Sequence, residues 1–266
     1  MCELLGICAN LPVTATLSLD VLARHGGDTG PHKDGWGIGY YQGAAIRLMK
    51  EAEAAAGSAW LRFIRDHELQ SPIILSHIRK ATRGARTLAN TQPFQRELGG
   101  RMHLFAHNGN LAGIDDLALA GANRFRPVGE TDSEIAFCEL MRRLAVLWDG
   151  ADGVPALERR HEVIAAFAAE IAPMGPANFL YADGDALFAH GNRCTQAGSG
   201  EIRPPGLHWL MRQCGADSGT GINGVALGGE RVEVALVASV PLSDEPWQPL
   251  AEGAVLCLRA GALAAF

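Results

Sequence analysis

The chain has 266 residues, 48% of them hydrophobic and 20% charged, a composition that argues against a disordered protein and lets residues 1–266 form a single globular domain. Its formal net charge of -6, without a basic stripe, zinc-finger spacing or RNA-binding motif, argues against nucleic acid as a partner. No apolar run approaches the roughly 18 residues of a membrane span, and no basic start precedes an apolar stretch and a cleavage site, so we predict no membrane contact and a cytoplasmic location.

The first candidate for chemistry is Cys2, which becomes the N-terminal residue if Met1 is removed. An α-amine titrates near pH ~8 and can take the thiol proton, so an N-terminal cysteine can act as a nucleophile without a histidine. Taken alone, a Met-Cys start is more often without function. The chain has no CxxC pair, and we expect its other cysteines to be reduced thiols in the core or in loops.

The first half of the chain is predicted to alternate between strands and short helices. Ser18 is predicted to cap a helix that Gly26 and Gly27 end, and Ser58 to cap a second. The second helix is expected to place Trp60, Leu61, Phe63 and Ile64 on or near its buried side. The predicted strands span residues 3–9, 36–41, 45–49, 73–78 and 103–107.

The second half is predicted to begin with helices and to end with strands. Thr131 to Glu134 has the pattern of a capping box before a helix that reaches Trp148, and a further helix is expected over residues 162–171. Predicted strands follow at 178–181, 186–189, 207–211, 232–240 and 255–258. Residues 215–229, rich in glycine, are predicted to be a mobile loop or hairpin tip. Because strands and helices do not strictly alternate, we expect an α+β fold with antiparallel sheets.

Polar clusters follow two of the predicted strands. Arg79 offers a planar guanidinium suited to a carboxylate, although an ordinary solvated or ion-paired arginine explains it equally well. Asn108 and Gly109 can donate a side-chain amide and a backbone N–H to an oxyanion, or they can form a simple turn. Asp132 can hold an ammonium group, yet a carboxylate in the first turn of a helix is stabilising anyway.

The two histidines His103 and His107 are four residues apart, a spacing that suits a metal pair on a helix. Here they lie in a predicted strand with no carboxylate or cysteine at ligand spacing. We therefore predict no metal site and no cofactor.

Six motifs in order resemble those of class II glutamine amidotransferases, the group with an N-terminal cysteine glutaminase domain. The resemblance extends to residues 237–247, and it is nearest to the stand-alone branch that includes the γ-glutamyl hydrolase of ergothioneine synthesis. The six motifs are Met1–Gly6, Asp34–Gly37, Ser76–Arg79, Asn90–Phe94, Ala106–Gly109 and Thr131–Glu134.

The resemblance implies an Ntn-hydrolase fold, a four-layer αββα sandwich of two antiparallel sheets. It also implies that Cys2 is the nucleophile, that Asn108 and Gly109 form the oxyanion hole, and that Arg79 and Asp132 bind the substrate's α-carboxylate and α-amine. Thr82 would assist at the carboxylate loop. The larger synthases of the family have Trp and His where Lys80 and Arg83 stand, so this loop is expected to close differently here.

Three functions fit these expectations. The first is a glutaminase that cleaves the γ-amide of glutamine through a Cys2 thioester and supplies ammonia to a separate synthase. The second is a free-standing amidohydrolase that cleaves a γ-glutamyl amide in a larger metabolite. The third is a regulatory module that binds glutamine without catalysis, against which the retention of Cys2 and of the other expected site residues argues.

Overall fold

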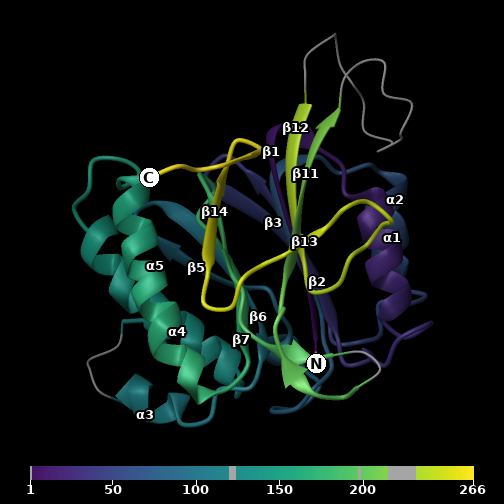
Figure 1. Ribbon diagram of the computed structural model, residues 1–266, viewed down its shortest axis with the longest axis horizontal. Helices are drawn as coiled ribbons and strands as arrows, with labels where there is room; N and C mark the ends of the chain where they lie inside the picture. Colours follow the sequence, from purple (N-terminus) through teal and green to yellow (C-terminus); the bar gives the residue numbers. More distant parts are fainter. Residues whose placement is uncertain (1, 120–123, 197–198, 215–231) are drawn as a thin grey trace.

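The computed structural model describes residues 2–119, 124–196, 199–214 and 232–266. Two antiparallel sheets lie face to face between two pairs of helices (Figure 1). The seven-stranded sheet has the order β13-β11-β12-β1-β4-β2-β3, and the six-stranded sheet has the order β15-β14-β8-β7-β6-β5. A separate two-stranded ribbon is formed by β9 and β10. The residues 215–229, predicted to be a mobile loop, lie outside the described residues.

The strands account for most of the elements and the helices cover the outer faces of the sheets. The strands of the seven-stranded sheet are β1 (Glu3–Val13), β2 (Trp36–Gln42), β3 (Ala45–Glu51), β4 (Ser71–Ile78), β11 (His208–Cys214), β12 (Val232–Ala238) and β13 (Gln248–Pro249). Those of the six-stranded sheet are β5 (Phe94–Leu98), β6 (Arg101–Gly109), β7 (Ala177–Ala182), β8 (Leu187–His190), β14 (Val255–Arg259) and β15 (Ala262–Leu263). The ribbon consists of β9 (Cys194–Thr195) and β10 (Ile202–Arg203). The helices are α1 (Thr16–His25), α2 (Ala59–Asp66), α3 (Ile114–Leu119), α4 (Asp132–Trp148), α5 (Leu157–Ile171) and the 3-10 turns Leu88–Asn90 and Ala172–Met174.

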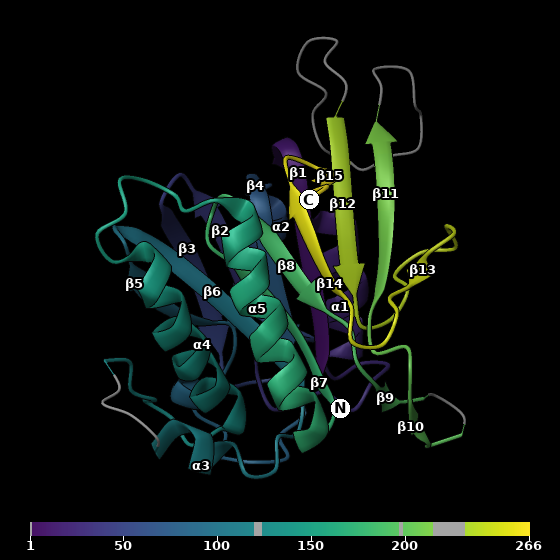
Figure 2. The same cartoon turned by 60° about the vertical axis from the view of Figure 1, so that its left-hand side comes forward.

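Three apolar layers hold this arrangement together. The central layer lies between the sheets and includes Leu4, Leu75, Leu104 and Leu180. A second layer packs α4 and α5 against the six-stranded sheet, and a third lies on the outer face of the seven-stranded sheet. In Figure 2, α4 and α5 stand in front of the six-stranded sheet, while α1 and α2 lie on the far side. The order of layers is therefore helix, sheet, sheet, helix.

Two of the predicted helix caps are confirmed and one is wrong. Ser58 accepts a hydrogen bond from the Leu61 backbone N–H at 3.2 Å, and Thr131 accepts one from Glu134 at 3.2 Å. The Glu134 side chain does not return to Thr131 as in a full capping box; it accepts from Gly129 N–H at 2.7 Å and from Arg96 at 2.6 Å. Helix α1 begins at Thr16, so Ser18 lies inside the helix.

The predicted buried face of α2 is also corrected. Ile64 is buried, but Trp60 is 54% exposed and Phe63 is 44% exposed. These two rings contact each other edge to face, at 6.1 Å between centroids, on the solvent side. The helix has only eight residues, so it packs Ile64, and in part Leu61, against the core while Trp60 and Phe63 remain outside.

A buried ion pair fixes α5 to the turn between β7 and β8. Arg160, which is 1% exposed, donates to Asp183 and to Asp185 at 2.6 Å each, and Asp183 is fully buried. We expect Arg160→Met to lower the free energy of unfolding by about 3–5 kcal/mol, because it leaves the Asp183 carboxylate buried without a counter-charge. Urea unfolding measures the change. The neighbouring exposed pair Arg159–Glu162 supplies the control, since Arg159→Met should lower the free energy of unfolding by less than about 1 kcal/mol. Equal losses of stability in the two variants would contradict the stabilising role of the buried Arg160–Asp183 pair.

Candidate active site

Residues from both sheets meet where β1 begins and where β4 and β6 end. Cys2 precedes β1, Arg79 follows β4, and Asn108 and Gly109 end β6. Because β1 and β4 are antiparallel, with Glu3 opposite Ile78, the start of one and the end of the other lie at the same edge. Asp132 is the first residue of α4. The structure therefore brings five of the predicted site residues to one edge of the sandwich, and places Thr82, exposed, in the segment that follows Arg79.

The Cys2 thiol is held by the backbone of the β4 exit. Its Sγ donates to the Lys80 carbonyl oxygen at 3.4 Å and accepts from the Lys80 N–H at 3.3 Å. Burial raises the pKa of the Cys2 thiol, while the Lys80 backbone hydrogen bond and the charge of Arg79 lower it and Asp132 raises it. The charges of Arg79 and Asp132 therefore both affect the pKa of the Cys2 thiol. Because burial raises this pKa, the thiol needs a base to become a thiolate at neutral pH.

Asn108 is joined to the strand of Cys2 by Ser239, a residue that the sequence analysis did not single out. The Ser239 Oγ accepts from the Leu4 N–H at 3.0 Å and from the Asn108 Nδ2 at 3.4 Å. The Ser239 N–H in turn donates to the Leu4 carbonyl at 3.1 Å. One amide hydrogen of Asn108 is thus held by Ser239, which leaves the second hydrogen for an oxyanion.

Gly109 lies where no larger residue fits. A Cβ at this position would lie 1.7 Å from the Pro176 carbonyl oxygen and 2.7 Å from the His107 Nε2. The end of β6 is also held by Gln92, whose side-chain amide bonds both the N–H of His107, at 2.6 Å, and its carbonyl, at 3.2 Å. The backbone beside Asn108 is therefore fixed on two sides.

Arg79 is buried and its terminal nitrogens are already engaged. Nη1 donates to the carbonyls of Asp34 and Ala85 at 3.4 and 3.1 Å, and Nη2 donates to those of Arg83 and Gly84 at 2.9 and 3.0 Å. The guanidinium therefore shapes the segment 83–85 in this state. A carboxylate would have to reach Nε or exchange with one of these carbonyls.

Asp132 is buried, and both carboxylate oxygens accept hydrogen bonds from the backbone. Oδ2 accepts from the Leu111 N–H at 2.8 Å, and Oδ1 accepts from the Ser133 N–H at 2.9 Å. These bonds hold the carboxylate at the start of α4 beside Leu111, two residues past the end of β6. A carboxylate has about four acceptor positions, so capacity remains for an ammonium group.

Burial lowers the pKa values of His77, His103 and His107, and hydrogen bonds to other side chains account for part of the polarity of the last two. His103 pairs with the Tyr181 hydroxyl at 2.5 Å and His107 with the Ser133 hydroxyl at 2.9 Å. Burial lowers the pKa of His107, and burial followed by the Arg79 charge lowers the pKa of His77 well below its usual range. Among the described residues, no group of three or more His, Cys, Asp or Glu side chains is arranged to hold a metal ion.

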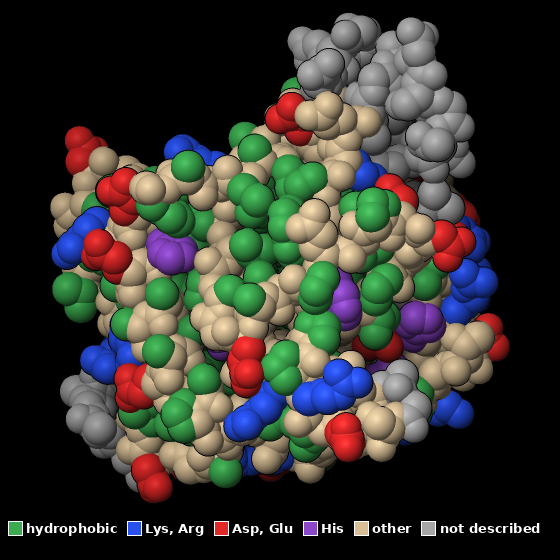
Figure 3. Space-filling model, in the orientation of Figure 1, with side chains coloured by type: hydrophobic (Ala, Val, Ile, Leu, Met, Phe, Trp, Pro, Cys, Tyr) green, Lys and Arg blue, Asp and Glu red, His purple; other side chains and the backbone are tan. Residues whose placement is uncertain are grey.

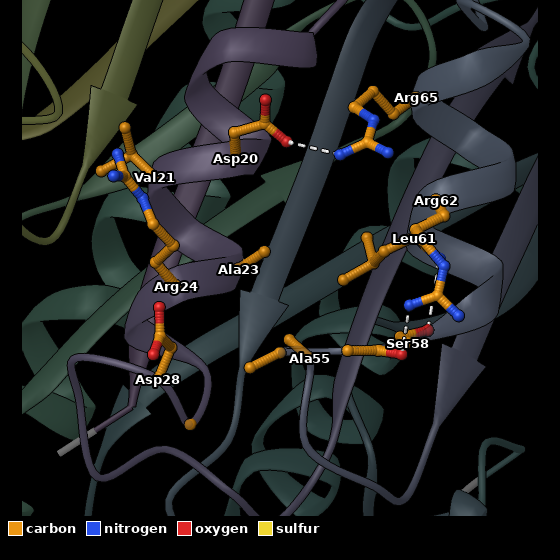
Figure 4. A pocket seen from close by; sticks show the side chains of 13 residues that line it. Asp20, Val21, Ala23, Arg24, Asp28, Ala55, Ser58, Leu61, Arg62 and Arg65 are labelled. Carbon is orange, nitrogen blue, oxygen red and sulfur yellow. Dashed lines mark hydrogen bonds and ion pairs between the residues drawn. The ribbon is translucent and has the colours of Figure 1, made fainter.

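A cavity of about 720 Å³ lies away from this edge, between α1 and α2 (Figure 4). Arg24, Arg62 and Arg65 line it together with Asp20 and Asp28, so its charges are mixed. On the face of Figure 3, positive and negative side chains are likewise interspersed. None of the predicted site residues lines the cavity, and we locate the site by the residues around Cys2 instead.

The family model of class II glutamine amidotransferases matches residues 1–266. The chain belongs to this family. Among its relatives, YafJ from Escherichia coli, named as a glutamine amidotransferase, is 36% identical over 260 residues, which cover 95% of each chain. The uncharacterised protein MJ1515 of Methanocaldococcus jannaschii is 32% identical over 98% of this chain and 70% of its own.

Solved structures give the same family and fold. A glutamine amidotransferase from Pseudomonas aeruginosa PA01 is 30% identical, with a TM-score of 0.69 over 99% of this chain and 100% of that one. The glutamine phosphoribosylpyrophosphate amidotransferase of B. subtilis, at 15% identity, shares the fold alone, with a TM-score of 0.61 over 98% of this chain and 48% of its own. The αββα Ntn-hydrolase sandwich and the assignment to an enzyme family are thus confirmed. Within the described residues, no helix has the length and apolar character that a membrane crossing requires.

Proposed function

We propose that this amidotransferase cleaves the γ-amide of glutamine, or of a γ-glutamyl amide, through a thioester on Cys2. The observation that carries the proposal is that Ser239 joins Asn108 to Leu4, two residues after Cys2, at the edge where Arg79 and Asp132 also lie. This set contains a nucleophile, oxyanion donors and one group for each charge of an α-amino acid. Removal of Met1 is part of the proposal, because the α-amine of Cys2 is its base.

The proposed reaction has two steps. The Cys2 amine takes the thiol proton, the sulfur attacks the γ-carbonyl, and the developing oxyanion is stabilised by the Asn108 amide and the Gly109 N–H. The C–N bond then breaks as the N-terminal ammonium protonates the departing nitrogen. Water cleaves the thioester to glutamate and restores the thiol. Because burial raises the pKa of the thiol, the amine base is needed at neutral pH.

Arg79 and Asp132 would orient the part of the substrate that does not react, with Thr82 assisting near the carboxylate. In the present state Arg79 is bonded to carbonyls of residues 83–85, so we infer that substrate binding rearranges this segment. The experiment that tests the proposed function is the release of glutamate from glutamine by purified protein that lacks Met1. A protein that binds glutamine but never releases glutamate would instead be a regulatory module.

Replacing Asp132 should weaken binding more than chemistry. We expect Asp132→Asn to raise the KM for glutamine about 10- to 100-fold, because a charge-assisted hydrogen bond to the α-ammonium is worth about 1.5–3 kcal/mol. The smaller effect on kcat is expected because the α-amine lies away from the scissile bond. Steady-state kinetics measure both constants. Asp116→Asn, at an exposed position on α3, is the control; an unchanged KM for Asp132→Asn would remove Asp132 from the substrate site.

The leaving group decides between two forms of this function. An ammonia-supplying glutaminase would pass ammonia to a separate synthase subunit, whereas a free-standing hydrolase would release a larger amine. One feature favours the second form: the Nε of Arg193 is buried and has no hydrogen-bond partner among the described residues.

A further inference from the structure

The two sides of the Cys2–Asn108 pair differ in the charged groups that they offer. In the seven-stranded sheet β4 lies on one side of β1 and β12 on the other; in the six-stranded sheet β5 lies on one side of β6 and β7 on the other. β4 packs over β6, and β12 packs over β15. The strand order from β4 to β12 in one sheet therefore follows the same direction as the order from β6 to β15 in the other. Arg79 therefore lies on the β4 and β5 side. The opposite side is formed by the ends of β12, β7 and β8.

Arg193 lies on this opposite side, in the segment between β8 and β9. The Nδ2 of the buried Asn178 donates both to the Asn108 carbonyl, at 3.1 Å, and to the Arg193 carbonyl, at 3.0 Å. The Asn178 Oδ1 accepts from the Asn192 N–H at 2.8 Å. One amide group thus fixes the backbone of Arg193 next to the backbone of the oxyanion donor. Figure 2 shows β9 and β10 on the same side of the molecule as the N-terminal end of β1.

The Arg193 side chain has one hydrogen-bond donor, Nε, without a partner within the described part of the chain. The side chain is half-buried, and its Nε is buried with no hydrogen-bond partner among the described residues. Arg203, in the adjoining ribbon, is by contrast exposed and paired with Glu201 at 3.7 Å. A buried donor without a partner is unfavourable, and an anion bound beside it would satisfy that donor. The Arg193 side chain is therefore a candidate for ligand recognition.

We infer that Arg193 forms a subsite for a carboxylate on the leaving group, so that the preferred substrate is a γ-glutamyl amide of an amino acid rather than free glutamine. The inference rests on the proposed function. A substrate whose glutamyl end lies toward Arg79 must direct its departing nitrogen across Cys2 toward the β7 and β12 side, where Arg193 lies. In the reaction the Cys2 sulfur attacks the carbonyl carbon of the γ-glutamyl amide and forms a thioester, the departing amino acid takes a proton on its nitrogen as the C–N bond breaks, and water then cleaves the thioester to glutamate and the free thiol.

The test compares three substrates: glutamine, γ-glutamylethylamide and γ-glutamylglycine, of which only the last carries a carboxylate on its leaving group. For the natural sequence, we expect kcat/KM for γ-glutamylglycine to exceed that for γ-glutamylethylamide at least tenfold. Arg193→Met should reduce this ratio at least tenfold, and Arg193→Lys should retain part of it because the charge remains. Arg203→Met is the matched control and should leave the ratio unchanged.

Three other outcomes would reject the proposed subsite, and each has a different meaning. Turnover of all three substrates without a preference would reject the subsite and leave the proposed function intact. A loss in Arg193→Met that is equal for both amides would place Arg193 on the glutamyl side instead. No turnover of any of the three would reject the proposed function and the subsite with it. Since the preference of the natural sequence needs no variant, the test stands even if Arg193→Met fails to fold, and thermal unfolding identifies that case.

Discussion

Replacing Cys2 by alanine is expected to reduce glutamate release to the uncatalysed background, a loss of at least about 10⁴-fold. The proposed mechanism has no other nucleophile: the sulfur forms the thioester, and the amine on the same residue moves the proton in both directions. Alanine is small, so removal of Met1 is expected to continue, and the variant tests the thiol alone. A coupled assay for glutamate at saturating substrate measures the rate.

The control for Cys2 is a thiol that is also accessible. Cys194 is half-buried and donates to the Pro205 carbonyl at 3.2 Å, and we expect Cys194→Ala to keep most of the activity. Substantial glutamate release by Cys2→Ala, in protein shown by thermal unfolding to be folded, would show that another group performs the attack.

Replacing Asn108 by alanine is expected to lower kcat about 10²- to 10³-fold, with a smaller change in KM. The side-chain amide stabilises charge that exists only after the sulfur has attacked, so its loss affects the transition state more than the bound substrate. That range corresponds to about 2.7–4 kcal/mol of transition-state stabilisation. The Ser239 hydroxyl, at 3.4 Å from Asn108 Nδ2, holds this amide in place.

Steady-state kinetics of Asn108→Ala and of Asn10→Ala provide the comparison. Asn10 lies near the other end of β1, where its side chain accepts from the Glu233 N–H at 2.9 Å. Both changes remove a side-chain amide from a strand, but only the first should affect kcat. A change in KM alone for Asn108→Ala would mean that the residue binds substrate without stabilising an oxyanion.

Most of the secondary structure could be predicted because its signals are local. The hairpin of β2 and β3 is predicted from the apolar runs on either side of Gln42 and Gly43, and its register joins Trp36 to Glu51. In the caps at Ser58 and Thr131, the side-chain hydroxyl accepts a hydrogen bond from the backbone N–H three residues later. Short edge strands were missed, including β5, β13 and β15, because two to five residues without a clear period carry little pattern.

The aromatic face of α2 illustrates why burial was harder to predict than helix formation. The positions of Trp60 and Phe63 suit a helix, and apolar residues are more often buried than exposed. Which side of a short helix meets the sheet depends on its packing against α1 and the seven-stranded sheet, and that depends on contacts far away in sequence. Helix formation is local, whereas burial is decided by the tertiary structure.

The sequence predicts candidate residues for the site, but it does not predict the residues that hold them in place. Cys2, Arg79, Asn108 and Asp132 are predicted from their residue types and from motif order, and the structure places them at one edge, while their roles stay predictions. Ser239 and Asn178 could not be found in this way, because they act on residues 131 and 70 positions away from them, and a serine at the end of a strand carries no signal by itself. The engagement of Arg79 by the carbonyls of its own loop was likewise not predictable from its spacing.

The central claim is that Cys2, freed from Met1, is the nucleophile. Its most direct test is mass spectrometry of the N-terminal peptide after incubation with 6-diazo-5-oxo-L-norleucine, an electrophile that resembles glutamine. We predict a peptide that begins at Cys2 and carries one adduct on its thiol, with protection by excess glutamine or γ-glutamylglycine. A peptide that retains Met1 and remains unlabelled, from protein that nevertheless releases glutamate, would contradict the account.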